Sequence, residues 1–126
     1  MVSEIIKNIA VVGAGSFIGG AARYLASFAM KGIGKGFPWA TLVVNVLGCF
    51  LIGLLWGYFS RDASEGNSWA LFLTVGVCGG FTTFSTFSKE ALIMLQSGNV
   101  WGFAAYVAVS VIVGIALVAL GYYLVR

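Results

Sequence analysis

The sequence contains no histidine and few charged residues, and both absences restrict what the protein can do. Without imidazole there is no histidine base, no histidine metal ligand and no conventional catalytic triad. Four acidic residues stand against seven basic ones, and charged residues make up only 9% of the chain. The net charge of +3 is too diffuse for a nucleic-acid footprint, so we expect no nucleic-acid partner.

Cysteine is also scarce, with two residues in the whole chain. Cys49 and Cys78 are far apart in sequence, and each lies inside an apolar segment. This spacing predicts neither a zinc site nor a redox pair. Each cysteine is more typical of a small buried apolar side chain.

Hydrophobic residues, by contrast, form 60% of the 126-residue chain, and the mean hydropathy is +1.01. A soluble domain is about 45–50% apolar, and a small fold cannot hide more apolar surface from water. Because one membrane crossing takes about 20 residues, four helices fit the length and five leave almost no connections. We therefore predict a single all-α membrane domain over residues 1–126, with spans at about 5–30, 39–59, 69–95 and 100–125.

The basic residues flanking these spans do not fix an orientation. One side of the membrane would hold Lys7, Arg61 and Arg126, and the other Arg23, Lys31, Lys35 and Lys89. An excess of Lys and Arg on one side normally sets the topology. Three basic residues against four set no clear orientation. Either one charge is misplaced near an interface, or the protein inserts both ways and pairs antiparallel with itself. We favour the second interpretation.

Small residues recur at four-residue spacing in every predicted span. Such spacing places them on one helix face, where they let helix backbones approach closely in lipid. The pattern favours a compact, dimeric bundle. The pairs are Gly15 and Gly19, Gly53 and Gly57, Gly76 and Gly80, and Ser110 and Gly114.

Asn45 is the one strongly polar side chain in the second span, and Thr41 lies one turn before it on the same face. Its amide offers two N–H donors and one acceptor. One interpretation is a structural hydrogen bond to a neighbouring helix. The other is a donor that faces a water-filled pathway.

The middle of the third span is a poor continuous helix. Gly79 and Gly80 cost helix stability, and the hydroxyls of Thr82 and Thr83 compete for backbone carbonyls. A break here frees carbonyl groups, which is tolerated at membrane depth only where they are buried or line a cavity. The segment is therefore either a structural kink or a cation site built from main-chain oxygens.

Aromatic and hydroxyl residues follow this segment at helical spacing. Phe84 and Phe87 share one face, flanked by a ladder of hydroxyls, namely Thr83, Ser85, Thr86 and Ser88. An aromatic pair alone is consistent with core packing. Ring edges are electropositive, however, and together with hydroxyl and amide donors they can replace water around a small anion. With no formal charge, such a site also lets the ion leave.

Arg23 and Glu90 are ionisable residues near span ends, and intramembrane charges are functional candidates. Arg23 has an alternative in reaching the membrane interface. Glu90 has an alternative in pairing with Lys89 or a loop cation.

Together these motifs resemble the Fluc (CrcB) family of fluoride channels over essentially the whole chain. The similar stretches are Gly15-x-x-x-Gly19-x-x-x-Arg23-Tyr24, Thr41-Leu-Val-Val-Asn45 and Gly79-Gly-Phe-Thr82-Thr-Phe84-Ser-Thr-Phe87-Ser-x-Glu90. The third stretch is the most specific. Gly114 departs from the pattern, because some members have a second serine there.

The resemblance implies a fluoride-selective channel that exports fluoride passively from a bacterium across its plasma membrane and so relieves fluoride toxicity. It implies an antiparallel, dual-topology homodimer with two pores and a central structural Na⁺ held by main-chain carbonyls of Gly79 and Thr82. Arg23 and Glu90 become vestibule or structural charges. The implied fluoride pathway contains Asn45, Phe84, Phe87, Ser110, Thr41, Ser85, Thr86 and Tyr106.

Other classes of membrane protein fit these features less well. A small multidrug-type exporter has similar length and span count, but it needs a carboxylate within its first span, and this span has none after Glu4. A structural subunit of a larger membrane complex would conduct nothing alone. An enzyme would lack a suitable base, so we expect none.

Overall fold

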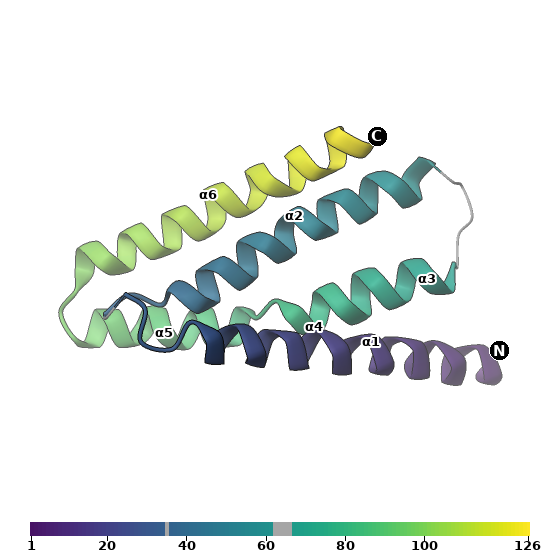
Figure 1. Cartoon of the computed structure of the whole chain (residues 1–126), viewed down its shortest axis with the longest axis horizontal. Helices are drawn as coiled ribbons and strands as arrows, with labels where there is room; N and C mark the ends of the chain where they lie inside the picture. The colour runs from purple at the N-terminus through teal and green to yellow at the C-terminus, as the bar shows by residue number, and fades with distance from the viewer. Residues whose placement is uncertain (35, 62–66) are drawn as a thin grey trace.

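The computed structural model describes residues 1–34, 36–61 and 67–126, which form helices joined by short connections (Figure 1). Within these ranges there is no β-strand, and four helical stretches are long and apolar enough to cross a membrane. They are Val2–Ala29, Trp39–Arg61, Ser68–Gln96 and Val100–Val125. The prediction of an all-α chain with four helices long and apolar enough to span a membrane is confirmed. Lys35, Asp62 and Glu65 lie outside the described residues.

Two long helices account for most of one half of the bundle. α2 (Trp39–Arg61) lies along α6 (Val100–Val125), and both termini of the chain lie at the same end of the molecule (Figure 1). In the other half, α1 (Val2–Ala29) packs along the N-terminal part of the third stretch, Ser68–Gln96. An even number of membrane crossings requires the two termini to lie on the same side, and this arrangement agrees with that.

Glycines allow α1 to approach the third stretch at backbone distance. A Cβ added to Gly15 would lie 2.5 Å from the carbonyl oxygen of Phe72 and 2.9 Å from the Cα of Gly76. A Cβ on Gly19 would collide with the carbonyl oxygen of Val77. Two of the predicted small-residue faces therefore pack against each other, and a side chain at either position would push the helices apart.

The α2 and α6 pair is built in the same way. A Cβ on Gly57 would lie 2.6 Å from the carbonyl oxygen of Tyr122, and one on Gly121 would lie 2.6 Å from that of Phe50. Gly53 meets the carbonyl of Val118 in the same manner. The helix backbones are therefore in direct contact at these glycines.

The third stretch is made of several segments. α3 (Ser68–Leu71) runs into the π-helical segment η1 (Phe72–Cys78), then into α4 (Gly79–Phe81). Thr82 and Thr83 have extended backbone, with ψ angles of 159° and 116°. α5 (Phe84–Gln96) follows and packs against α6. The two threonines thus separate two helical segments within one candidate membrane span.

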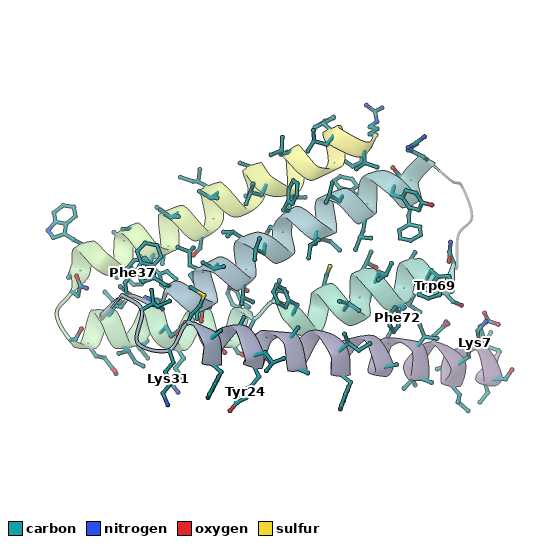
Figure 2. The ribbon with its side chains drawn as sticks, in the orientation of Figure 1. Lys7, Tyr24, Lys31, Phe37, Trp69 and Phe72 are labelled. Carbon is teal, nitrogen blue, oxygen red and sulfur yellow. The ribbon has the colours of Figure 1, made fainter. Side chains whose placement is uncertain are left out.

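Few of the described residues are buried. The buried apolar cluster contains Leu42, Ala91, Met94 and Tyr106, close to the α5 end of the bundle. Many large apolar side chains are exposed around the helices, and Figure 2 shows Tyr24 pointing away from the bundle. Lipid or a second subunit is the surrounding that such a surface requires.

Candidate functional site

A groove of about 400 Å³ lies between α2, α6 and the segments around Thr82 and Thr83. It brings together residues from widely separated parts of the sequence. None of its lining residues carries a formal charge. They are Asn45, Gly48, Cys49, Ile52, Thr74, Cys78, Gly79, Thr82, Thr83, Phe84, Phe87, Ser110 and Val111.

Asn45 is bound on both sides of its amide to the backbone of Thr83. Its Nδ2 donates to the carbonyl oxygen of Thr83 at 3.0 Å, and its Oδ1 accepts from the N–H of Thr83 at 2.8 Å. The amide therefore replaces helical hydrogen bonds that the extended threonines cannot make. The second N–H of the Asn45 amide takes no part in these two bonds.

The carbonyl groups of Gly79 and Thr82 lose their helical donors in this arrangement. In a continuous helix the N–H of Thr83 would donate to Gly79, and that of Thr86 to Thr82. Here Thr83 donates to Asn45, and Thr86 donates to the Oγ1 of Thr83 at 3.2 Å. Gly79 and Thr82 both line the groove. Neutral main-chain oxygens at a discontinuous helix are ligands that a hard monovalent cation accepts, so the two residues fit the expected sodium ion.

The start of α5 faces the same groove. The Thr83 hydroxyl caps this helix by accepting from Thr86 N–H, and Phe84 and Ser85 supply the next N–H groups of the first turn. The N-terminal end of a helix carries partial positive charge, and the C-terminal end, here α4 at Phe81, carries partial negative charge. The groove thus combines an anion-attracting helix end with cation-attracting carbonyls.

Arg23 reaches the same region from α1. Its Nε donates to the carbonyl oxygen of Gly80 at 3.2 Å, and the residue is partly buried. In a continuous helix that carbonyl would accept from Phe84 N–H. Arg23 therefore contacts the backbone of α4 instead of pointing only to the membrane interface.

Three aromatic rings form a continuous row that leads away from the groove. The ring centroids of Phe84 and Phe87 are 5.8 Å apart, and those of Phe87 and Tyr106 are 4.9 Å apart. Tyr106 is completely buried, and its hydroxyl donates to Glu90 Oε1 at 3.0 Å. Glu90 thus has Tyr106 as its partner, a contact that neither of its predicted alternatives, Lys89 or a loop cation, includes.

Ser110 brings a hydroxyl to the groove from α6. Its Oγ is buried, and among the described residues it has no hydrogen-bond partner. Gly114, one turn later, leaves space beside Cys49, whose sulfur would lie 3.3 Å from a Cβ added there. An unsatisfied buried hydroxyl is costly, which makes Ser110 a candidate ligand contact.

The remaining predicted pathway residues lie beside the groove, outside its lining. Thr41 is buried one turn before Asn45. Thr86 Oγ1 accepts from the hydroxyl of Thr83 at 3.1 Å, and Ser85 Oγ lies 3.4 Å from that same hydroxyl. The hydroxyls of the first turn of α5 therefore form one connected cluster.

Comparison with known proteins identifies the relationship. The profile of a family described as "CrcB-like protein, Camphor Resistance (CrcB)" matches residues 10–122. The chain belongs to the CrcB family. This confirms the resemblance derived from the motifs.

Curated relatives of the CrcB family cover nearly the full chain. A protein of Agrobacterium fabrum is 44% identical over 120 residues, which are 94% of this chain and 96% of the relative. One from Methylobacterium nodulans is 41% identical over 119 residues, with coverages of 94% and 96%. One from Prosthecochloris aestuarii is 39% identical over 123 residues, with coverages of 98% and 96%. Each is named "Fluoride-specific ion channel FluC". These names describe channels and not enzymes, in agreement with the sequence prediction.

Several groove residues of this CrcB chain were not among the predicted site residues. Thr83 is central, because it supplies the backbone group that Asn45 holds and the hydroxyl that caps α5. A threonine at the N-cap position of a helix is common, so the sequence contained a signal for the capping role of Thr83. Thr74 and Cys78 line the groove because of the π-helical turn, which no spacing rule predicts.

Proposed function

We propose that this chain is a fluoride-selective channel that lets fluoride leave a bacterial cell passively and so relieves fluoride toxicity. The observation that carries the proposal is a groove with hydrogen-bond donors and no formally charged lining residue. A cationic site would trap an anion, whereas conduction needs binding weak enough for release. The printed names of the CrcB relatives support the same ion.

Each donor group has a defined part in this mechanism. The free N–H of Asn45 and the hydroxyl of Ser110 replace water molecules around the ion. The edges of Phe84 and Phe87 face it with positive quadrupole. The first turn of α5 adds partial positive charge. Fluoride is small and strongly hydrated, so it needs many such donors at close range.

The row of aromatic rings gives the pathway a direction. From Phe84 the ion moves past Phe87 toward Tyr106 and Glu90, with Thr41 and the hydroxyls of Ser85 and Thr86 as further polar contacts along α2 and α5. Arg23 supplies vestibule charge on the α1 side and steadies the Gly80 carbonyl.

The functional unit in this proposal is an antiparallel homodimer with two pores, inserted in the plasma membrane in both orientations. The nearly balanced basic residues on the two sides support mixed insertion. Phe84 is 79% exposed in a single subunit although it lines the groove. A second subunit would cover it and close the open side of the groove.

A sodium ion at the two-fold axis would join the two subunits. The carbonyls of Gly79 and Thr82 from each copy would hold it, because those oxygens are released from the helical ladder. A closed two-fold dimer brings identical groups together on its axis. The ion's role would be structural, since its ligands are main-chain oxygens and not the N–H and hydroxyl donors that receive fluoride.

Ion-specific efflux from liposomes that contain only this protein tests the function. We expect fluoride to leave passively, chloride to be retained, and the rate to be the same with and without a proton gradient. Chloride efflux at an equal rate would contradict a fluoride channel. Efflux that requires a proton gradient would favour an exporter, and no efflux of either ion would favour a structural subunit.

Removing sodium tests the proposed metal site separately. Replacing Na⁺ with a large organic cation should lower the dimer's thermal stability in detergent, because a ligand that binds only the assembled form stabilises it. Restoring Na⁺ should restore both the dimer and fluoride efflux. A dimer equally stable in both solutions would contradict the site even if fluoride efflux is confirmed.

A further inference from the structure

The connection between α1 and α2 has a shape that only glycine supplies. Gly32, Gly34 and Gly36 have positive φ angles of 87°, 63° and 89°, a region that other residues seldom adopt. The turn closes with a hydrogen bond from Phe37 N–H to the carbonyl of Gly34 at 3.1 Å. Phe37 follows this turn directly, and its ring packs against that of Tyr106 on α6.

From there an aromatic row reaches the buried end of the fluoride pathway. The ring of Trp39 packs over Gly34, where a Cβ would collide with it. Its centroid is 4.7 Å from that of Phe37. Phe37 meets Tyr106 edge to face, with centroids 5.5 Å apart and planes at 77°. Figure 2 places Phe37 at the end of the bundle where α2 begins.

Tyr106 is held from three directions. Its ring lies against Phe37 and Phe87, and its hydroxyl is bound to Glu90. It is completely buried, whereas Phe87 is half-buried and lines the groove. Interiors this closely packed transmit a change of shape to neighbouring groups. A change at Phe37 therefore reaches Phe87 through Tyr106.

We infer that Phe37 is a positioning residue of the permeation pathway: from the α1–α2 connection it holds the Tyr106 ring against Phe87 and so fixes the ring edge that Phe87 presents to the ion. The inference rests on the proposed function and deepens it. Phe37 itself does not line the groove. It acts on fluoride only through the rings that follow it.

Conservative substitutions at Phe37 test this position. The edge-to-face contact between Phe37 and Tyr106 stabilises the position of the Tyr106 ring. We therefore expect Phe37→Leu to lower the rate of fluoride efflux from liposomes by about threefold to tenfold. Phe37→Tyr keeps the ring and should retain the wild-type rate. Phe28→Leu is the matched control, because this ring is 63% exposed on α1 and should leave efflux unchanged. Efflux at the wild-type rate in a folded Phe37→Leu dimer would overturn the inference.

A double-mutant cycle separates positioning from general destabilisation. If Phe37 acts through Phe87, the Phe37→Leu loss should shrink to near nothing in a Phe87→Leu background. A loss of equal size in both backgrounds would overturn the inference. If Phe37→Leu does not fold, Trp39→Leu removes the support one ring further away and should give a smaller loss that depends on Phe87 in the same way. Equal losses from Trp39→Leu in both backgrounds would count against the inference.

A spectroscopic readout keeps this test independent of conduction. With 3-fluorotyrosine in place of Tyr106, the fluorine resonance should shift and broaden in Phe37→Leu, and stay in place in Phe28→Leu. If no variant and no wild-type protein passes fluoride, the proposed function fails, while this shift still reports the contact. A resonance unchanged by Phe37→Leu would overturn the contact itself.

Discussion

At the scale of single residues, Asn45 shows how one polar side chain can serve both structure and function. Its position predicted a polar group inside the membrane, and two interpretations stood open. The structure places its amide on the backbone of Thr83, with hydrogen bonds of 3.0 and 2.8 Å. Spacing alone could not name this partner, because Thr83 is 38 residues away. Asn45 also lines the groove, together with Ser110.

Removing the Asn45 amide should therefore destabilise the protein. Asn45→Leu leaves the backbone groups of Thr83 without partners, which should cost about 1–3 kcal/mol, measured as a lower midpoint of thermal unfolding of the purified protein. Leu47→Ala, at a half-exposed position of the same helix, is the control and should lower the midpoint less. A Leu variant as stable as the wild type would contradict the bridging role.

Asn45→Asp in the same experiment distinguishes the two roles of this residue. The carboxylate keeps the acceptor for Thr83 N–H and loses the donor. It also adds negative charge to a groove that has none. Stability should fall less than in Asn45→Leu, while fluoride efflux should fall at least as far.

At the scale of elements, the helix pairs depend on glycines that permit backbone contact. Gly13 and Gly15 are two residues apart on α1 but differ in surroundings. A Cβ on Gly15 would lie 2.5 Å from the carbonyl oxygen of Phe72, whereas one on Gly13 would meet nothing within 4 Å. The two positions form a matched pair for testing the contact between α1 and η1.

We expect Gly15→Ala to be destabilising and Gly13→Ala to be neutral or stabilising. Overpacking a close contact costs about 1–3 kcal/mol, whereas alanine in an open helical position gains up to about 1 kcal/mol over glycine. Thermal unfolding of each purified variant measures the difference. Equal effects of the two substitutions would show that α1 is not held at backbone distance.

The sequence predicted the number and extent of the helices better than the breaks and π-helical turns within them. Long apolar runs predicted four helices able to cross a membrane, and the glycine spacing predicted the close-packed faces of α1, α2 and η1. Hydrophobic periodicity could not predict the divisions of the third stretch. Its non-helical residues are Thr82 and Thr83, and the segment Phe72–Cys78 is π-helical. These features depend on partners in other helices, above all Asn45 and the glycines of α1.

At the scale of the whole molecule, much of the apolar surface of the chain is exposed. Phe84 is 79% exposed, and the buried cluster is small and displaced to one end of the bundle. Sequence alone predicted a dimer through its balanced charges and resemblance. It could not predict that Phe84 would stand exposed beside an open groove, because that follows from how α2, α5 and α6 are placed.

Mixed insertion is the prediction that belongs to this scale. Reporters fused after Arg126 should be found on both sides of the membrane in comparable amounts, since the basic residues give no net preference. Adding lysines beside Lys31 should favour one orientation and lower fluoride efflux, because an antiparallel pair needs both forms. Full efflux from a protein found on one side only would contradict the antiparallel dimer.

The central claim is that the donor-lined, uncharged groove selects fluoride. The most direct measurement is the reversal potential of currents through the purified protein in a planar bilayer, with a fluoride gradient, equal chloride on both sides and an impermeant anion for balance. The account predicts that the current reverses at the fluoride equilibrium potential. A reversal at zero, where chloride is at equilibrium, would contradict it.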